Sequence, residues 1–247
     1  RMNAPFRPSL AAVRATSLAE VDEVRRIEAF VAGHPDATPF HRPAWLLAAA
    51  RGTGNRARAV LLERGWELTG YLPLLEVHSP LFGGMLASSG FGVGGGILLA
   101  GGEDAGPLFA ALEELALRLS CPAAELRGGP LPEGRAGWKV RFDSHCGFVT
   151  PLAADDEAQL LAIPRKQRAE VRKGLGTDLT VEIGRGEADR ADHYAVYAES
   201  VRNLGTPVFP RRLFAEVLDA FGEDADILTV RHKGAPVASV LSLYHRG

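Results

Sequence analysis

The residues best suited to chemistry form a basic cluster in the second half of the chain. Positions 165–173 read Arg-Lys-Gln-Arg-Ala-Glu-Val-Arg-Lys, five cations and one anion, for a local charge of 5 − 1 = +4. The apolar Val171 and Leu175 follow Arg168 at i+3 and i+7, so a helix here places Arg168 along its apolar side. Arg172 follows at i+4. An arginine so placed extends to solvent, pairs with a carboxylate, or holds a phosphate in its planar fork. The cluster is an anion-site candidate, with a solvated helix face as the alternative.

A second candidate is the glycine-rich stretch Gly90-Phe91-Gly92-Val93-Gly94-Gly95-Gly96. Glycine lacks the Cβ that blocks close approach, so backbone amides here could contact a phosphate or carboxylate. The stretch does not open a helix directly after a strand, and it lacks the Lys-Ser/Thr ending of a P-loop. Dinucleotide and P-loop assignments therefore fail. The alternative is a flexible or bulged connection between strands.

The cysteines argue against a metal site. Cys121 and Cys146 are the only two, too far apart in sequence for a CxxC knuckle and too few for a disulfide framework. His145 neighbours Cys146 in an expected strand, where adjacent side chains point to opposite faces, which disfavours a Cys/His dyad. We expect no metal and no tightly bound cofactor.

Composition describes a folded chain without a global preference for polyanions. Its 247 residues are 46% hydrophobic and 23% charged, with a net charge of −2. Such a balance gives no overall drive toward nucleic acid or anionic membrane, so any basic site must be local. No apolar stretch reaches the ~18 residues of a membrane span, and Arg1–Leu10 lacks the apolar run of a signal peptide. The expected location is the cytoplasm.

Hydrophobic periodicity predicts a helix from Val21 to Val31 behind a Ser17/Glu20 capping box, and a loop from Ser79 to Gly102. Further helices are expected at 43–50, 107–119, 189–203 and 210–221, and an element at 155–175 precedes a strand. Expected strands are 59–62, 69–77, 124–127, 139–149 and 179–183, with a hairpin at 227–244. This order indicates an α+β protein with a mixed sheet.

The chain repeats itself. Phe40–Val77 aligns without a gap on Phe209–Arg246, at an offset of 209 − 40 = 169. Each copy contains an aromatic entry, a helix, a strand, a glycine turn and a second strand. Two domains are expected, 1–152 and 153–247. Because nothing after the second hairpin corresponds to the later elements of the first copy, the second domain is expected to be incomplete, through truncation or because a partner supplies strands.

The sequence also resembles a known family. Residues 164–175, Pro-Arg-Lys-Gln-Arg-Ala-Glu-Val-Arg-Lys-Gly-Leu, followed by Thr180-Val181-Glu182, resemble the K-x-R-x-x-x-R-K-[GA] stretch that opens the second domain of Fem-type (FemABX) transferases, which are tandem GNAT-like proteins. The segments 197–209 and 234–239 resemble the FemAB-related proteins associated with exosortase and PEP-CTERM exopolysaccharide systems.

The resemblance implies tandem GNAT-like (acyl-CoA N-acyltransferase-like) domains with mixed central sheets. It implies transfer of an acyl or aminoacyl group from acyl-CoA or aminoacyl-tRNA to an amine of a cell-envelope or exopolysaccharide precursor. That acceptor would be a small molecule or a lipid- or nucleotide-linked precursor. A protein whose function is only to bind tRNA is a further possibility, which the net negative charge of the chain disfavours.

The resemblance also suggests site residues. Arg168 and Arg172, with Lys166 beside them, match positions where the family's basic helix meets acceptor phosphates. Tyr244, expected in a hairpin strand facing a cleft, is a further substrate-positioning candidate, with a core or rim tyrosine as the alternative. No catalytic base is assigned, because residues 94–98, Gly-Gly-Gly-Ile-Leu, stand where the family usually carries Arg-Gly and a nearby acid. A non-catalytic scaffold that retains an anion-binding cleft is therefore the alternative function.

Overall fold

A computed structural model describes residues 11–79 and 83–246. The described chain divides into two compact units. The N-terminal unit contains residues up to Arg135, together with 207–226 and 242–246, and the C-terminal unit contains Ala136–Thr206 and Ile227–Leu241. These units group residues by contact, so the domain boundary between residues 152 and 153 stays a prediction.

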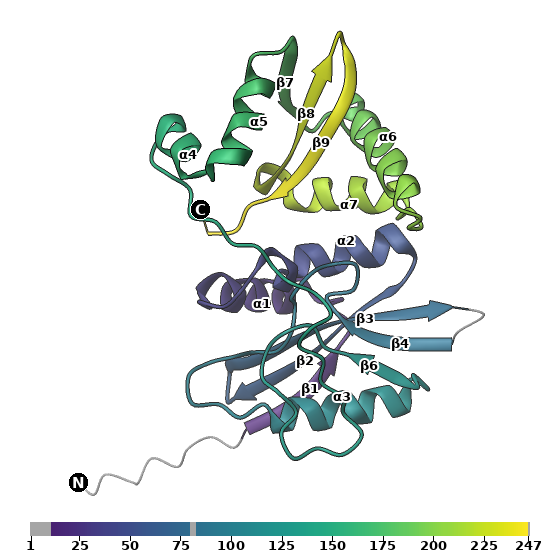
Figure 1. Ribbon diagram of the computed structural model, residues 1–247. Coiled ribbons are helices and arrows are strands. Elements are labelled where there is room, and N and C mark those ends of the chain that lie inside the picture. The colour runs from purple at the N-terminus through teal and green to yellow at the C-terminus, as the bar shows by residue number, and fades with distance from the viewer. Residues whose placement is uncertain (1–10, 80–82, 247) are drawn as a thin grey trace, which may run out of the picture. The chain divides into compact units, whose positions relative to one another are not determined.

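A mixed sheet forms the centre of the N-terminal unit (Figure 1). Its strand order is β1-β2-β3-β4-β6, and β5 also pairs with β3. The pairs β1–β2, β2–β3, β3–β4 and β3–β5 are antiparallel, and the pair β4–β6 is parallel. The strands are β1 (Ala11–Thr16), β2 (Arg56–Arg64), β3 (Glu67–Ser79), β4 (Gly83–Ser88), β5 (Leu98–Leu99) and β6 (Ala123–Glu125).

Helices cover both faces of this sheet. In Figure 1, α1 (Val21–Gly33) and α2 (Pro43–Thr53) lie above the strands and α3 (Gly106–Arg118) lies below. The core between these layers contains fully buried side chains: Ile27, Leu46, Leu61, Leu62, Tyr71, Leu72, Leu74, Leu108 and Leu112. The helix α7 (Arg211–Phe221) packs on α2 so closely that a Cβ on Gly52 would lie 2.5 Å from Leu213 Cα. Short 3₁₀ turns span Pro39–His41 and Gly222–Asp224.

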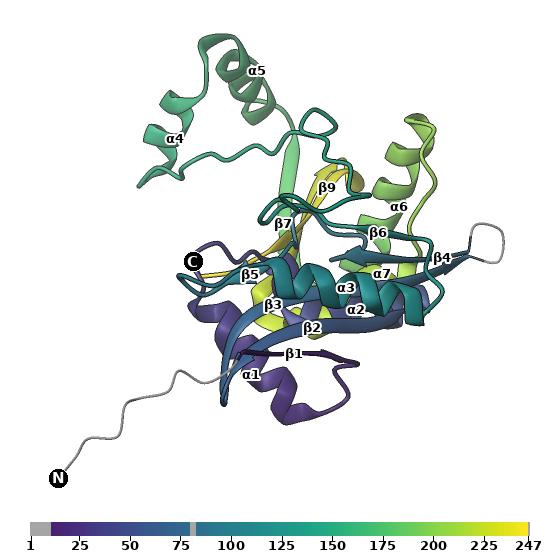
Figure 2. The same ribbon diagram turned by 90° about the horizontal axis from the view of Figure 1, so that it is seen from below.

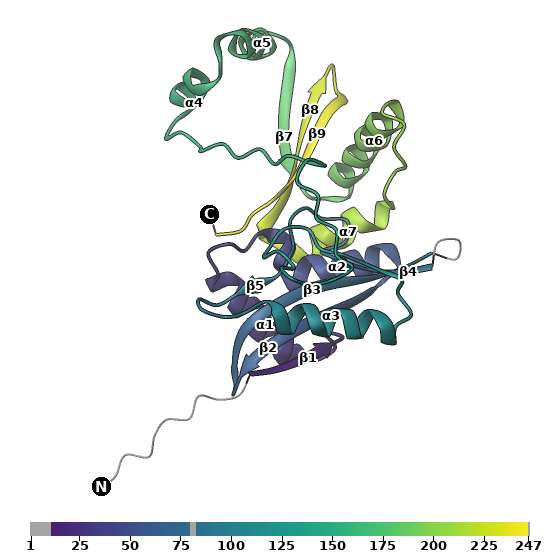
Figure 3. The same ribbon diagram turned by 60° about the horizontal axis from the view of Figure 1, so that its bottom comes forward.

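The C-terminal unit holds a three-stranded sheet, β7 (Leu179–Gly184), β8 (Ala225–His232) and β9 (Ala235–Leu243), in that order. The helix α6 (Glu187–Asn203) lies on one side of the strands, and α4 (Asp156–Ala162) and α5 (Arg165–Leu175) lie on the other (Figures 2 and 3). Polar contacts hold α6 in place: Arg231 donates to Glu182 Oε2 and Asp192 Oδ2, each at 2.7 Å, and His193 Nδ1 lies 2.8 Å from Ser239 Oγ.

The predicted repeat is present, but its offset is one residue smaller than the sequence alignment indicated. The helices α2 and α7 start at 43 and 211, and the strands β1 and β7 start at 11 and 179, so both pairs differ by 168. The β1–β2 register Ala11↔Arg64 likewise becomes Leu179↔His232 in β7–β8. Because side chains alternate along a strand, the offset of 169 matched residues on opposite faces.

Three local predictions were wrong. The segment 139–149 forms no strand, and its Phe142 and Phe148 are 80% and 92% exposed, because an alternating pattern does not supply a neighbouring strand. The expected loop 79–102 contains β4 and β5, since pairing with β3 overrides the low strand propensity of glycine. The expected element 155–175 is two helices, separated at Ile163–Pro164, because proline restricts the residue before it.

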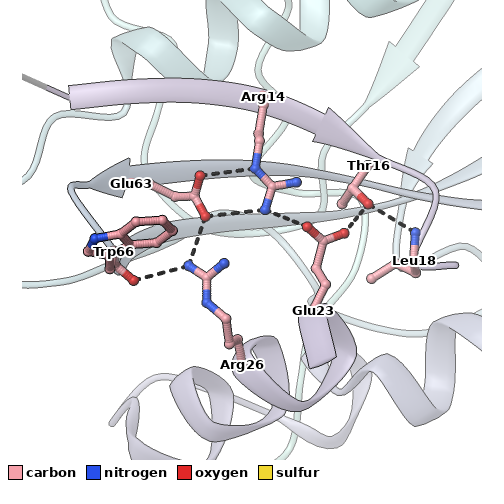
Figure 4. A network of polar contacts seen from close by, with 7 residues as sticks. All are labelled: Arg14, Thr16, Leu18, Glu23, Arg26, Glu63 and Trp66. Carbon is pink, nitrogen blue, oxygen red and sulfur yellow. Dashed lines mark hydrogen bonds and ion pairs between the residues drawn. The ribbon is translucent and has the colours of Figure 1, made fainter. Parts of the chain in front are cut away.

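The predicted first helix forms without the Ser17 capping box. Its N-cap is Glu20, with no side-chain capping bond. Instead, Thr16 Oγ1 accepts from Leu18 N at 3.1 Å and donates to Glu23 (Figure 4).

A network of ion pairs continues from this point. Arg14 Nε and Arg26 Nη2 donate to Glu63 at 3.0 and 2.8 Å. The hydrogen bond from Arg14 keeps the pKa of Glu63 below its usual value, despite partial burial. The network ties α1 to β1 and β2.

Candidate functional site

The predicted basic cluster forms the exposed helix α5. It follows an extended Pro164, and it has no acidic residue in its first turn. Among the described residues, no carboxylate pairs with Lys166 or Arg172. Cations near a helix N-terminus oppose the helix dipole, so Lys166 costs some helix stability where it stands. The exposed, unpaired charges leave α5 free to attract an anion.

Arg168 departs from its predicted environment. No residue of α5 is buried, and Val171 and Leu175 are 38% and 75% exposed, so the expected buried side is absent within the described chain. The Arg168 guanidinium turns back instead: Nε donates to Ile163 O at 3.0 Å, and Nη2 donates to Leu161 O and Ile163 O at 2.8 Å. A cation at carbonyls that end a helix is favourable. Arg168 thus fastens the end of α4 to the start of α5.

Tyr244 lies one residue beyond β9, not inside the hairpin strand as expected. Its OH donates to Asp226 Oδ2 at 2.8 Å, and its N–H donates to Asp224 O at 2.8 Å. The hydrogen bond to Asp226 raises the pKa of Tyr244. Tyr244 belongs to the N-terminal unit, whereas Lys166, Arg168 and Arg172 belong to the C-terminal unit. Their assignment as substrate-binding residues stays a prediction.

The glycine-rich stretch Gly90–Gly96, named here the glycine loop, follows β4 in the N-terminal unit. A Cβ on Gly92 would lie 2.6 Å from the Phe40 ring, and one on Gly90 would lie 2.7 Å from Leu75 Cδ2. A Cβ on Gly96 would lie 2.0 Å from Gly128 O. Close packing against the chain itself therefore requires these glycines. The stretch is a tightly packed connection, whereas the alternative expected from the sequence was a flexible or bulged one.

Side-chain donors hold several carbonyls of the glycine loop, among them Gly95 O, which accepts from Ser89 Oγ at 3.4 Å. Trp45 Nε1 donates to Gly90 O at 3.3 Å, Arg127 Nη1 to Gly92 O at 2.8 Å, and Thr38 Oγ1 to Gly94 O at 3.3 Å. A further donor is the imidazole of His41, which bonds the backbone of Gly96. These donors come from separate elements around the loop. They fix its peptide planes and so give it a single conformation.

His41, which the sequence analysis did not select, is a buried part of this arrangement. Its Nδ1 accepts from Thr38 N at 3.0 Å, so the other ring nitrogen carries the proton given to Gly96. Burial lowers the pKa of His41 to about 4, and the nearby His34 lowers it further. His41 is therefore neutral at pH 7. The sequence signal for His41 was its position two residues before Pro43, which begins a helix. That signal does not predict burial of the imidazole, because burial depends on tertiary contacts.

A half-buried polar group lies at the start of α2. Arg42 Nε donates to Glu28 Oε1 and its Nη1 to Asp224 Oδ2, each at 2.7 Å, and the guanidinium lies 5.0 Å from the Phe221 ring centre. This arginine joins α1, α2 and the end of α7. Within the described residues no group of three His, Cys, Asp or Glu side chains could hold a metal ion. No helix in the same residues is long and apolar enough to cross a membrane.

These features define the class of protein. The mixed sheet, its helical cover and the repeat at an offset of 168 make an α+β protein with tandem GNAT-like architecture, as the sequence predicted. The family described as "Acetyltransferase (GNAT) domain" matches residues 163–247, a stretch that begins two residues before α5.

The solved structure of FemX supports the fold, and two further structures are similar over about half of this chain. The crystal structure of FemX is similar over 88% of this chain, with a TM-score of 0.55 and 19% identity. This chain spans 57% of the FemX chain. A ribosomal-protein-alanine N-acetyltransferase from Brucella melitensis is similar over 54% of this chain and 99% of its own, with 17% identity and a TM-score of 0.35. A GNAT family acetyltransferase from Staphylococcus aureus covers 57% of this chain and 98% of its own, with 14% identity and a TM-score of 0.34. No curated protein matches the chain.

Proposed function

We propose that this chain is a Fem-type transferase that moves an acyl or aminoacyl group to an amine of a cell-envelope or exopolysaccharide precursor. Its donor is acyl-CoA or aminoacyl-tRNA, and its acceptor is a small molecule or a lipid- or nucleotide-linked precursor. Action in an exosortase and PEP-CTERM system, and a cytoplasmic location, belong to the same proposal. The observation that carries it is the FemX-like fold over 88% of the chain, combined with the GNAT match at 163–247.

Acyl transfer requires that the amine and the donor carbonyl be held close together in the correct orientation, and a folded site can supply this. The amine nitrogen attacks the donor carbonyl carbon and forms an amide bond, while the C–S or C–O bond to the carrier breaks. The proton lost by the amine ends on the departing thiol or hydroxyl of the carrier. Holding both reactants in line removes much of the barrier, and donors aimed at the developing oxyanion remove more. The proposal assigns no general base to a side chain.

The proposed acceptor contact is the exposed face of α5. Lys166 and Arg172 are free to bind phosphate oxygens, because the described residues offer them no carboxylate partner. Arg168 has a different part in this proposal: two of its nitrogens are engaged by carbonyls of Leu161 and Ile163, which leaves Nη1 for a ligand. Tyr244 is retained as a substrate-positioning candidate. The helix α5 therefore supplies both fixed and free cations.

The test measures binding and transfer together. Thermal unfolding of the protein is followed with acetyl-CoA, aminoacyl-tRNA and nucleotide-linked sugars, and mass spectrometry then follows acyl transfer to an amine-bearing nucleotide sugar. A ligand at about 100 times its Kd stabilises the folded state by about 2.7 kcal/mol. We expect the double variant Lys166→Gln/Arg172→Gln to lose most stabilisation by the phosphorylated acceptor and to keep that by the donor.

The matched control is Arg202→Gln, which removes one charge from an exposed position on α6. It should bind as the parent does. Binding of the phosphorylated acceptor without binding of any donor, and without transfer, would favour the non-catalytic scaffold. If neither class of ligand stabilises the protein, the transferase proposal is wrong.

A further inference from the structure

The segment 242–246, which contains the end of β9 and the residues just after it, belongs to the N-terminal unit. Tyr244 N donates to Asp224 O at 2.8 Å, and Arg246 Nη1 donates to His34 O at 2.6 Å. Arg246 has a φ of 64°, a left-handed conformation that costs free energy in a residue with a Cβ. A short segment with this strain can open locally, without unfolding of the whole unit.

His245 lies between the two attached residues, Tyr244 and Arg246. Its side-chain Nε2 is buried and has no hydrogen-bond partner among the described residues. A protonated imidazole carries an N–H on both ring nitrogens, so protonation of His245 would leave a charged donor buried without an acceptor. Such burial costs free energy. The attached segment therefore favours the neutral form of His245.

Two arginines oppose a positive charge on His245. Arg246 is its neighbour in the chain. Arg42 reaches the same place from the start of α2, because its Nη1 donates at 2.7 Å to Asp224, the residue whose carbonyl oxygen accepts from Tyr244 N. Burial lowers the pKa of His245, and Arg42 and Arg246 lower it further. A proton on His245 would add a third cation to this place.

Two carboxylates at this place act in the opposite direction. Glu28 on α1 and Asp224 raise the pKa of His245, but less than burial and the arginines lower it. Both carboxylates are already engaged, since Arg42 Nε donates to Glu28 Oε1 and its Nη1 donates to Asp224 Oδ2. His41, from the turn before α2, also lies within electrostatic reach of His245 and is neutral at pH 7. The groups around His245 therefore favour its neutral form.

Release of the segment removes these constraints. In solvent the pKa of His245 returns to its usual 6.5, which is higher than the pKa in the attached segment. The released form therefore binds a proton more readily than the attached form. The stability that neutral His245 gives to the attachment is complete above about pH 6.5 and is lost as the pH falls.

We propose that residues 242–246 form a proton-controlled latch, which is attached to the N-terminal unit at neutral pH and is released when His245 takes up a proton. Histidine is suited to this role because its charge changes near neutral pH. Release breaks the contacts of Tyr244 and Arg246 and relieves the strain at Arg246. The latch does not depend on the proposed transfer reaction, although release moves Tyr244, a substrate-positioning candidate.

The experiment measures hydrogen exchange of single amides by NMR at pH 7 and pH 5, corrected for intrinsic exchange rates. The Tyr244 amide reports attachment, because it donates to Asp224 O. The Leu61 amide, in the centre of β2, reports opening of the whole unit. We expect Tyr244 to be less protected than Leu61 and to lose at least about threefold in protection between pH 7 and pH 5. The upper limit is about 25-fold, for an imidazole that takes up no proton while attached.

Two results of this experiment would overturn the latch. Equal protection of the Tyr244 and Leu61 amides would show that the segment opens only together with the whole unit. Constant protection of Tyr244 between pH 7 and pH 5 would show that no proton releases the segment.

Variants identify the group that takes up the proton. His245→Gln keeps a polar side chain that has no charge in this pH range, so its Tyr244 protection at pH 5 should stay within about 1.5-fold of that at pH 7. A fall equal to that of the parent would mean that His245 is not the trigger, and the proposal would be wrong. The control is His78→Gln, which replaces an exposed histidine on β3 and should reproduce the fall of the parent.

A further variant tests the attachment itself. Arg246→Gln removes the hydrogen bond to His34 O and should lower the protection of Tyr244 at pH 7 about twofold to fivefold. Unchanged protection would show that this contact does not hold the segment, contrary to the proposal. None of these measurements uses acyl transfer. The expected exchange together with a failed transfer assay refutes only the transferase, and a constant exchange profile refutes only the latch.

Discussion

The strand pairs β1–β2 and β7–β8 have the same register but different cover. Val60, Leu62 and Leu72 lie on the face of the first sheet that α3 covers, and they are at most 1% exposed. At an offset of 168, Leu72 corresponds to Val240, which is 57% exposed. The neighbouring Val181 and Ile183 on β7 are 60% and 68% exposed. Similar apolar strands are therefore buried or exposed according to the helix beside them.

The other face of each sheet carries an ion pair with its charges exchanged. Arg14 on β1 pairs with Glu63 on β2. The positions 168 residues later are Glu182 on β7 and Arg231 on β8, which also pair. In each repeat a side chain of the following helix joins the pair: Glu23 on α1 contacts Arg14, and Asp192 on α6 contacts Arg231. The arrangement depends on opposite charge at two fixed positions, and the order of the charges is interchangeable.

The largest expected effect contrasts a packed glycine with an open one. Gly96→Ala would place a Cβ 2.0 Å from Gly128 O, and we expect a loss of at least about 3 kcal/mol in the free energy of unfolding. Gly174→Ala on α5 meets no atom within 4 Å, and it should stabilise that helix by about 0.5–1 kcal/mol. Urea denaturation followed by tryptophan fluorescence and circular dichroism checks both changes. A Gly96→Ala protein within about 1 kcal/mol of the parent would contradict the packed loop.

The next contrast compares equivalent positions on the two sheets. Leu72→Ala removes a fully buried side chain and should cost about 3 kcal/mol. Val240→Ala should cost no more than about 0.5 kcal/mol, because that side chain is largely in solvent. Equilibrium denaturation of both variants measures the difference. Equal losses would show that the face of β9 is covered in solution.

A pH contrast tests the buried His41. Its folded pKa of about 4 lies below the usual 6.5, so the unfolded chain binds the proton first. Stability from neutral His41 is therefore complete above pH 6.5 and is lost as the pH falls toward 4. The loss between pH 7 and pH 5 should be about 2 kcal/mol.

The control for this effect is His41→Asn, whose side-chain oxygen can still accept from Thr38 N. Comparing the unfolding free energies of parent and variant at pH 7 and pH 5 cancels the contributions that the two proteins share. The variant should lack this pH-dependent component of about 2 kcal/mol. Parallel pH profiles for the two proteins would show that His41 does not titrate as a buried group.

The smallest expected effect concerns the exchanged ion pairs. Glu63 is 12% exposed and accepts from both Arg14 and Arg26, so Glu63→Gln should cost about 1–2 kcal/mol. Glu182 is 53% exposed, and Glu182→Gln should cost less than about 1 kcal/mol. Denaturation in low and high salt distinguishes them, since only the exposed pair is strongly screened. A larger loss for Glu182→Gln would reverse the comparison.

Local patterns in the sequence predicted most of the helices, the two hairpins and the repeated order of elements. Apolar periodicity and short turns are local properties, so the α2 and α7 helices and the two hairpins were predictable within a few residues. It also indicated the basic cluster of α5, because charge is visible without a structure. The one-residue error in the repeat offset arose because chance identities at 169 outweighed the strand register that fixes 168.

The contacts that the candidate residues make depend on the tertiary structure. Arg168 was placed on a buried helix side, but its guanidinium bonds the carbonyls of Leu161 and Ile163. The donors to the glycine loop, among them Trp45 and Arg127, come from positions up to 127 − 38 = 89 residues apart. No local pattern predicts such contacts, because they depend on which elements the packed sheet brings together.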